Sequence, residues 1–224
     1  MIETRRDPRG PLDRSTLVDF SSVFGRKAPL EIEIGSGMGG FALGHAAAHP
    51  EINLVAMEVR KKFAKETAEK AEARGLSNLL VLEADAKVVL PRMCAPRSVD
   101  VFHIQFPDPW WKPRHHARRL VEDEFSILLY NLLRVSGLLE VRTDVQARGE
   151  EMCEALEAVG FSNLFGPGGL APYDPTEVPS TRERGYLQRG EPVYRYKFTR
   201  SEAPPRWAEG ALGPTRVYTE HRKK

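Results

Sequence analysis

The stretch Leu30-Glu-Ile-Glu-Ile-Gly-Ser-Gly-Met-Gly-Gly40 decides the fold of this chain. Its first half is a short, largely apolar run that is typical of a buried strand, and its second half is a glycine cluster that predicts a tight turn. Because glycine has no Cβ, the backbone there can turn sharply and come close to a ligand. The stretch therefore predicts a buried strand whose carboxyl end opens onto a binding site.

Strand and helix patterns alternate along most of the remaining chain. Apolar runs predict further strands at Asn53–Glu58, Leu79–Leu82, Val99–Ile104, Leu138–Arg142, Phe161–Phe165 and Val193–Thr199. Helical periodicity predicts helices at 38–48, 60–74, 86–93, 122–133 and 146–159. Because repeated units of this kind form parallel sheets, we expect an α/β fold with helices on both faces. Such sheets bind ligands beyond the carboxyl ends of their strands.

The composition is that of a globular protein. The chain has 224 residues, of which 41% are hydrophobic and 29% are charged, and this excludes a disordered or fibrous protein. No apolar run reaches the ~20 residues that cross a bilayer, and the first residues do not resemble an export signal. We therefore expect a cytoplasmic protein with no membrane partner. With 33 Lys and Arg residues against 31 Asp and Glu residues, a nucleic-acid partner needs a local basic patch.

The length suits one domain with additional segments at its ends. We expect an N-terminal extension at 1–29, a catalytic domain at 30–200 and a basic C-terminal tail at 201–224. The Gly- and Pro-rich segment 167–179 predicts a binding loop or lid, because long irregular connections are uncommon inside compact domains. Cys94 and Cys153 have no second Cys or His at ligand spacing, so we expect no disulfide and no metal. The choice between monomer and homodimer stays open.

Three acidic side chains are predicted at the ends of three neighbouring strands. Glu33 precedes the first glycine of the cluster, Glu58 ends the next apolar run, and Asp85 follows the third. As a set they favour a ligand with cationic and hydroxyl groups, such as S-adenosylmethionine, over a pyrophosphate. Taken singly, Glu58 and Asp85 are explained equally well as caps of the helices that follow them.

The glycine cluster also fits a different class of enzyme. Gly35, Gly37 and Gly40 satisfy the G-x-G-x-x-G spacing of dinucleotide-binding folds, and Glu58 stands where a ribose-binding acid is expected. A nicotinamide-dependent oxidoreductase is therefore an alternative that the glycine cluster leaves open.

A second motif, Phe106-Pro-Asp-Pro-Trp-Trp-Lys112, follows the predicted strand at Val99–Ile104 and so opens onto the same edge of the sheet. Two prolines fix the backbone around Asp108, and Trp110 and Trp111 offer flat surfaces on which a purine can stack. Tryptophans more often belong to the core, but a core position does not explain an aspartate between two prolines. The motif predicts a rigid shelf that binds a base.

A basic segment follows this motif directly. Its cations and histidines are Lys112, Arg114, His115, His116, Arg118 and Arg119. Cations beside an aromatic shelf suit both a phosphate backbone and an extruded base. Most charge runs are only solvated faces, but the place of this one next to the predicted site favours RNA binding.

These motifs together resemble the bacterial tRNA (guanine-46-N7)-methyltransferases, a family with the class I methyltransferase fold. The resemblance runs from about Phe24 to Phe198 and rests on Glu33–Gly39, Met57–Val59, Ala84–Ala86, Phe106–Leu120, Thr143–Asp144 and Ser180–Phe198. It implies a doubly wound, mostly parallel, seven-stranded Rossmann-like sheet whose last strands are antiparallel. It also implies transfer of a methyl group from S-adenosylmethionine to N7 of guanine 46 in the variable loop of tRNA.

The resemblance also implies roles for individual residues. The implied cofactor-binding residues are Glu33, Gly35, Gly37, Gly39, Glu58, Asp85, Ala86 and Asp108. The implied substrate-binding residues are Lys112, Arg114, His115, His116, Arg118, Arg119, Asp144, Ser180, Thr181, Arg182 and Glu183. Asp108 is also the implied catalytic residue. The chain departs from the family at Arg182, where an aromatic residue is usual, and at Val59–Lys62, where a histidine-containing turn is frequent.

The chemistry implied for Asp108 is electrostatic. Guanine N7 already carries a lone pair, so methyl transfer requires alignment more than removal of a proton. We expect the Asp108 carboxylate to accept a hydrogen bond from the guanine and to offset the positive charge that develops on the purine.

Two further alternatives stay open beside the oxidoreductase. An amino methyltransferase acting on adenine or cytosine uses an Asp/Asn-Pro-Pro-aromatic motif, which Asp108–Trp110 resembles except for the second proline. A non-catalytic RNA-binding protein would keep the basic segment but would not need three acids at the edge of the sheet.

Overall fold

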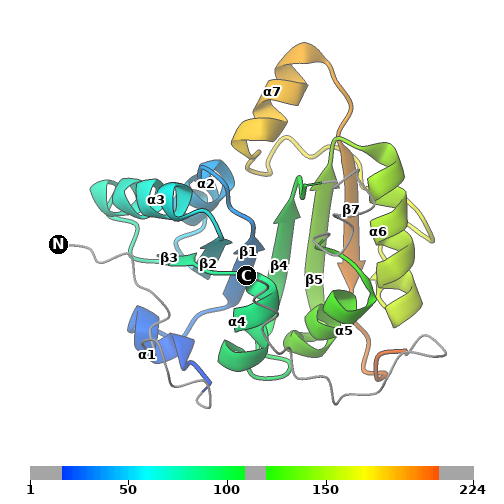
Figure 1. The fold of residues 1–224 in the computed structure, drawn as a ribbon, viewed down its shortest axis with the longest axis horizontal. Coiled ribbons are helices and arrows are strands. Elements are labelled where there is room, and N and C mark those ends of the chain that lie inside the picture. The colour runs from blue at the N-terminus through cyan, green and yellow to red at the C-terminus, as the bar shows by residue number, and fades with distance from the viewer. Residues whose placement is uncertain (1–16, 109–119, 207–224) are drawn as a thin grey trace, which may run out of the picture.

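The computed structural model describes residues 17–108 and 120–206 (Figure 1). The strands are β1 (Leu30–Ile34), β2 (Asn53–Glu58), β3 (Leu79–Glu83), β4 (Val99–Gln105), β5 (Leu133–Thr143), β6 (Ser162–Asn163) and β7 (Tyr194–Thr199). The helices are α1 (Phe20–Phe24), α2 (Gly40–Ala48), α3 (Lys61–Ala73), α4 (Ala86–Met93), α5 (Asp123–Leu132), α6 (Gln146–Val159) and α7 (Thr181–Arg189). In the described ranges, no helix combines the length and the apolar character that crossing a membrane requires.

The strands of the described residues form one seven-stranded sheet with the order β3-β2-β1-β4-β5-β7-β6. β1 to β5 are parallel, and β7 runs antiparallel to β5 on one side and to β6 on the other. This confirms the predicted doubly wound sheet with antiparallel last strands. Ile34 at the end of β1 is in register with Met57 on one side and Ile104 on the other, so the three strands end level. The strand order reverses between β1 and β4, where such sheets bind ligands.

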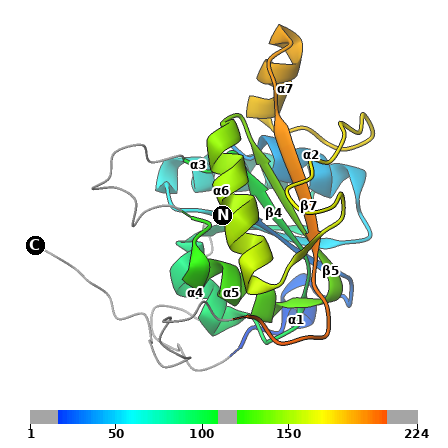
Figure 2. The same ribbon diagram turned by 90° about the vertical axis from the view of Figure 1, so that its right-hand side faces the viewer.

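Helices cover both faces of the sheet, as expected. α2 and α3 pack on one face through a small cluster that includes Ala42, Leu54 and Ala64. α4, α5 and α6 pack on the other face, where Leu90 and Phe125 belong to a larger core. Figure 2 shows α2 and α6 on opposite sides of the sheet. β1 is buried along its whole length, as expected for a central strand with helices on both faces.

Two strands differ from their predicted bounds by more than one residue at an end. β5 begins at Leu133 rather than Leu138, because the residues before the regular ladder already pair with β4 across an irregularity in register. The predicted strand at Phe161–Phe165 is reduced to β6. There the Asn163 side chain accepts a hydrogen bond from the backbone N–H of Phe165 at 3.0 Å, which turns the chain away from the sheet.

α7 is an element that the sequence analysis did not predict. Ser180 is its N-cap, and the Ser180 Oγ accepts a hydrogen bond from the Glu183 N–H at 3.2 Å. The spacing Ser-x-x-Glu is that of a capping box, so a signal for the start of this helix is present in the sequence. Gly190 in the left-handed conformation ends it. In Figure 1, α7 stands above the carboxyl ends of β4 and β5.

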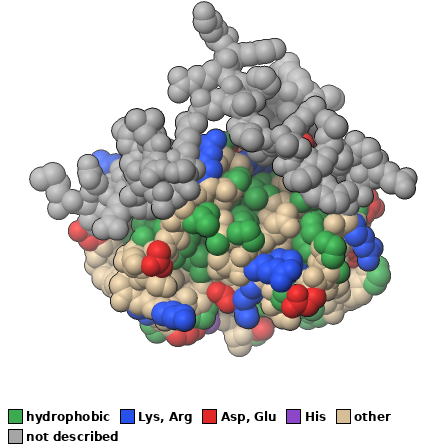
Figure 3. Space-filling model, turned by 90° about the horizontal axis from the view of Figure 1, so that it is seen from below, with side chains coloured by type: hydrophobic (Ala, Val, Ile, Leu, Met, Phe, Trp, Pro, Cys, Tyr) green, Lys and Arg blue, Asp and Glu red, His purple; other side chains and the backbone are tan. Residues whose placement is uncertain are grey.

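The end of the molecule opposite α7 carries mixed charges. Among the described atoms, Figure 3 shows Lys and Arg side chains next to Asp and Glu side chains, with hydrophobic side chains between them. On the described part of this end, charge of one sign does not gather into a patch. The features that can select a ligand lie at the other end of the sheet.

Candidate functional site

A cleft of about 1000 Å³ lies at the carboxyl ends of the central strands. Its walls are the glycine loop after β1, the turn after β4 and the start of α7. The predicted site residues on these walls are Glu33, Gly35, Gly37, Glu58, Asp85, Ala86, Asp108, Ser180, Thr181 and Arg182. The fold therefore brings the three predicted acids and part of the late sequence motif around one space.

Gly39 and Gly40 allow neighbouring helices to pack closely, because neither has a side chain. Gly39 is the N-cap of α2 with a φ of 74°, and a Cβ there would lie 2.3 Å from Thr67 Cγ2 of α3. A Cβ on Gly40 would lie 2.0 Å from Thr181 Oγ1 at the start of α7. Both positions therefore have a packing reason to be glycine, and Gly39 is the one predicted cofactor residue that is absent from the described walls of the cleft.

Glu58 and Asp85 both order the loops around the cleft. Glu58 Oε2 accepts a hydrogen bond from the Gly37 N–H at 2.8 Å, and its Oε1 accepts one from the Arg60 N–H at 2.8 Å. Asp85 is the N-cap of α4 and accepts from the Lys87 N–H at 2.9 Å. Asp85 thus caps a helix, whereas Glu58 ties the glycine loop to the start of α3 without capping it, and both carboxylates line the cleft. A carboxylate has about four acceptor positions, so each keeps capacity for the hydroxyl groups of a ligand.

Glu33 and Gln105 place unpartnered polar atoms at the floor of the cleft. Glu33 is 1% exposed and its Oε2 has no hydrogen-bond partner among the described residues, and neither polar atom of the buried Gln105 amide has one there. Burial raises the pKa of the Glu33 carboxyl to about 8, and the neighbouring Glu58 carboxylate adds to this rise. Because buried polar groups are nearly always satisfied, these atoms favour a polar ligand above them. No sequence motif predicts a role for Gln105.

Asp108 lies at the rim of the cleft. Phe106, two residues earlier, has a φ of 50°, a conformation that costs a non-glycine residue free energy and that is frequent at functional sites. This turn carries Asp108 towards α3, where its Oδ2 lies 3.6 Å from an Arg60 guanidinium nitrogen. Arg60 also lies 3.9 Å from Glu58 and lines the cleft, so it links two predicted cofactor residues. Arg60 belongs to the segment that departs from the family pattern.

Asp144 and Arg182 connect β5 to α7. Arg182 donates a hydrogen bond to Asp144 Oδ2 at 3.1 Å, and the Tyr186 hydroxyl donates to the same oxygen. The Arg182 guanidinium lies 5.7 Å from the centre of the Phe106 ring, and the Tyr186 ring stacks parallel to Phe106 at 5.9 Å. Arg182 therefore covers the turn that carries Asp108. It does so at the position where the resemblance leads us to expect an aromatic residue.

Glu183 lies below the cleft and belongs to a buried ion network. Its Oε2 accepts from Arg142 at 2.6 Å, and its Oε1 accepts from two nitrogens of Arg195 at 3.0 and 2.6 Å. All three side chains are almost fully buried. Glu183 thus fixes α7 to β5 and β7, and the described walls of the cleft do not include it. Trp110, Trp111 and the basic segment 112–119 lie outside the described residues.

The sequence matches a family model and curated relatives over most of its length. Residues 27–196 match a family described as "putative methyltransferase". The chain is 51% identical over 185 residues to the tRNA (guanine-N(7)-)-methyltransferase of Myxococcus xanthus, covering 83% of this chain and 90% of the relative. It is 52% identical over 192 residues to the protein of the same name from Anaeromyxobacter dehalogenans, covering 85% and 96%. These matches do not favour the oxidoreductase alternative.

Solved structures share the fold at low sequence identity. The 16S rRNA (adenine(1408)-N(1))-methyltransferase from Catenulisporales acidiphilia superposes with a TM-score of 0.60 at 18% identity, covering 86% of this chain and 95% of that one. The 16S rRNA methyltransferase KamB gives a TM-score of 0.59 at 18% identity, covering 84% and 95%. Fold and sequence thus agree, and the chain belongs to the methyltransferase family whose curated bacterial members are named tRNA (guanine-N(7)-)-methyltransferases.

Proposed function

We propose that this protein transfers the methyl group of S-adenosylmethionine to N7 of a guanine in tRNA, and that this guanine is position 46 of the variable loop. The observation that carries the proposal is the arrangement of acids around one cleft that also ends at Asp108 and at the start of α7. The names of the relatives support the substrate and the atom that is methylated.

The residues of the cleft fit S-adenosylmethionine. The unpartnered Glu33 Oε2 and the unpartnered Gln105 amide would meet the amino acid part, which carries an ammonium group and a carboxylate. Glu58 and Asp85 would accept hydrogen bonds from the ribose hydroxyls and the adenine amine. When bound, this cofactor supplies the methyl group from its sulfonium. The sulfur then remains as a neutral thioether in the product that leaves. An ammonium group above Glu33 would favour the ionised carboxylate and so lower its raised pKa.

Asp108 would act on the guanine. Its carboxylate is half exposed at the rim, so it can accept a hydrogen bond from a base N–H as the base enters. As the methyl group arrives at N7, positive charge builds up on the purine, and a fixed carboxylate stabilises that charge. Arg60 pairs with Asp108 at 3.6 Å, and the guanine would compete with Arg60 for the carboxylate.

The direct test is transfer of a labelled methyl group from S-adenosylmethionine to an unmodified tRNA transcript, followed by mapping of the modified base. We expect label on N7 of guanine 46 and none in a matched transcript that has adenine at that position. Label on an exocyclic amine would establish the amino methyltransferase alternative instead. Binding of tRNA without any transfer would leave only an RNA-binding protein, and tight binding of a nicotinamide cofactor would favour an oxidoreductase.

Replacement of Glu58 tests the cofactor half of the site. Glu58→Ala removes a buried charged acceptor, and loss of such a hydrogen bond costs about 1.5–3 kcal/mol, or roughly 10- to 150-fold in affinity. We expect this loss for S-adenosylmethionine in isothermal titration calorimetry. Glu69→Ala, an exposed change on α3 that removes only a pair with Lys65, is the control and should bind like the parent. Parental affinity of Glu58→Ala would remove Glu58 from the proposed site.

Replacement of the basic segment tests the RNA half. A variant in which Arg114, Arg118 and Arg119 are all alanine should bind tRNA more weakly and with a flatter salt dependence. Each lost phosphate contact lowers the slope of log affinity against log salt concentration by about one. The affinity for S-adenosylmethionine should not change. An unchanged slope, measured by filter binding between low and physiological salt, would show that this segment is only a solvated face.

A further inference from the structure

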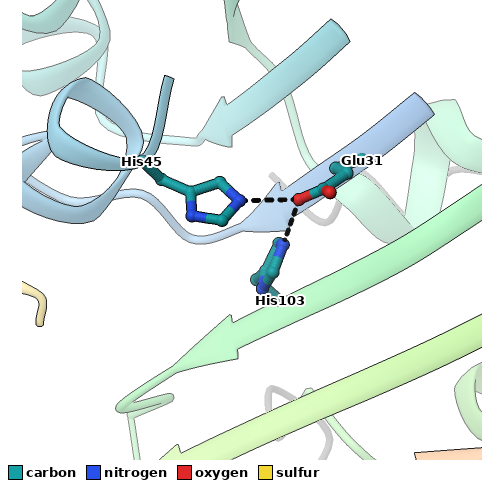
Figure 4. A group of neighbouring side chains, drawn as sticks. All are labelled: Glu31, His45 and His103. Atoms are coloured by element: carbon teal, nitrogen blue, oxygen red, sulfur yellow. Dashed lines mark hydrogen bonds and ion pairs between the residues drawn. The ribbon is translucent and has the colours of Figure 1, made fainter. Parts of the chain in front are cut away.

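A buried cluster of metal-binding side chains lies beneath the cofactor cleft. It consists of Glu31 on β1, His45 on α2 and His103 on β4. Glu31 Oε2 lies 2.7 Å from His45 Nε2 and 2.8 Å from His103 Nε2, and the three atoms lie within 4.8 Å of one another. Figure 4 shows both rings directed at the same carboxylate oxygen. None of the three side chains belongs to the described walls of the cleft.

We propose that Glu31, His45 and His103 form a binding site for Zn²⁺. Two imidazole nitrogens and one carboxylate oxygen are a donor set that proteins use for zinc, with a further position left for water. Ligand atoms in a tetrahedral zinc site lie about 3.3 Å apart, given metal–ligand bonds of about 2.0–2.2 Å. Small shifts of two rings and one carboxylate would therefore open the cluster to that spacing.

The neighbouring charges suit a divalent cation. His103 Nδ1 lies 3.3 Å from Glu140 Oε2, close enough for an ion pair, although the two atoms are not aligned as a hydrogen bond. A histidine that binds zinc usually directs its other ring nitrogen at a carboxylate. With both histidines neutral, the carboxylates of Glu31 and Glu140 offset the two charges of the ion, and Glu177 offsets the charge of Lys197 beside Glu140. Glu140 is itself held by Lys197 Nζ at 3.0 Å.

The two histidines of the cluster differ in their exposure to solvent. His103 is 3% exposed and lies within the sheet, whereas the His45 side chain is 14% exposed on α2. The ion would therefore reach the site past His45. Phe41 contacts both rings, at 4.8 Å from each ring centre, and shields the cluster on the side of the helix.

The cluster is placed to support the cofactor cleft. Glu31 and Glu33 lie on the same face of β1, since alternate residues of a strand share a face, and His103 and Gln105 do so on β4. On each strand the cluster residue therefore lies two positions before Glu33 or Gln105, whose unpartnered polar atoms form the floor of the cleft. A bound ion would join β1, β4 and α2 at this level. The spacing of the two cysteines predicts no metal, whereas His45 and His103 lie 14 and 72 residues from Glu31 and so form no local motif.

The experiment measures metal uptake by the full chain. Protein freed of metal with a chelator is dialysed against Zn²⁺ and analysed by elemental mass spectrometry. We expect about one zinc per chain, and at least a tenfold lower occupancy in His45→Gln and in His103→Gln. His49→Gln is the matched control, because His49 lies one turn after His45 on the exposed side and pairs with Glu51. It should retain the zinc of the parent.

Two further measurements guard against loss of folding and against binding elsewhere. If the buried His103→Gln fails to fold by circular dichroism, His45→Gln at the edge of the cluster still decides the question. Glu140→Gln keeps all three ligands and should weaken the affinity about 10- to 100-fold, because it removes the carboxylate behind His103. Co²⁺ in place of Zn²⁺ should give the visible absorption of a tetrahedral site in the parent and lose it in His45→Gln.

Two results would overturn the proposal. If the parent takes up no more zinc than His45→Gln, the cluster is only a hydrogen-bonded group, with a proton on His103 between two carboxylates. If the parent and both histidine variants each bind one zinc, the ion lies elsewhere on the chain. Neither result depends on methyl transfer, so the zinc site and the proposed function stand or fall separately.

Discussion

Asp108→Ala is expected to lower the single-turnover rate of methyl transfer about 10²- to 10³-fold, the usual effect of removing one preorganised electrostatic group. Asp108 lies on a turn that begins at Phe106, whose φ of 50° is strained for a non-glycine residue, and Arg60 lies 3.6 Å from its carboxylate before the base arrives. The measurement uses saturating tRNA and S-adenosylmethionine, so that a binding defect is not mistaken for a chemical one. Affinity for tRNA should stay near that of the parent.

Asp108→Asn separates the two roles proposed for this carboxylate. The amide keeps an acceptor oxygen for a guanine N–H but cannot offset the charge that develops on the purine. We therefore expect a rate between those of the parent and of Asp108→Ala. Asp174→Ala is the control, because Asp174 is an exposed loop residue whose carboxylate accepts hydrogen bonds from Thr176, away from the described walls of the cleft. Parental rates in both Asp108 variants would end the proposed mechanism.

Glu183→Ala is expected to lower the free energy of unfolding by about 3–5 kcal/mol, because it leaves buried Arg142 and Arg195 without their shared carboxylate. The cost falls mainly on the buried Arg195, which loses both of its hydrogen bonds to Glu183, whereas Arg142 keeps its pair with Glu177 at 2.5 Å. Equilibrium unfolding in urea measures the effect. We also expect a weaker tRNA affinity, because α7 loses its attachment to β5 and β7.

The control for this change is an ion pair of the same type on the surface. Glu191→Ala removes the exposed partner of Arg189, and exposed pairs contribute little to stability. Its urea midpoint should match that of the parent. If Glu183→Ala were equally stable, water would reach the two arginines and the network would not fix α7.

The sequence predicts the half of the site that is built from local patterns. The alternation of strands and helices predicts a parallel sheet, and this sheet places three acids at neighbouring strand ends: Glu33, Glu58 and Asp85. The strand order confirms that β1, β2 and β3 are adjacent. The same logic placed Asp108 beside them, since it follows β4. Each of these four residues is predicted from its own position at the end of one strand.

The other half depends on contacts between distant residues, which no local pattern records. Arg60 reaches Asp108 across the cleft, and Gln105 is recognised only by its lack of partners. α7 has few apolar residues because ion pairs, rather than an apolar face, fix it to the sheet. Hydrophobic periodicity therefore missed it, although the capping box at Ser180 marks its start. The resemblance implies that Glu183 binds the substrate, and no local pattern records its burial against Arg142 and Arg195.

The position of β7 also bears on how the chain is synthesised. β7 lies between β5 and β6, so β5 has an unpaired edge until the ribosome has made Tyr194 to Thr199. Roughly fifty residues separate the end of β5 from the start of β7, which at about 5–20 residues per second takes on the order of 3–10 seconds. An exposed strand edge pairs readily with other chains. The nascent protein is therefore most prone to aggregation during this interval, when β1 to β5 have been made but β7 has not.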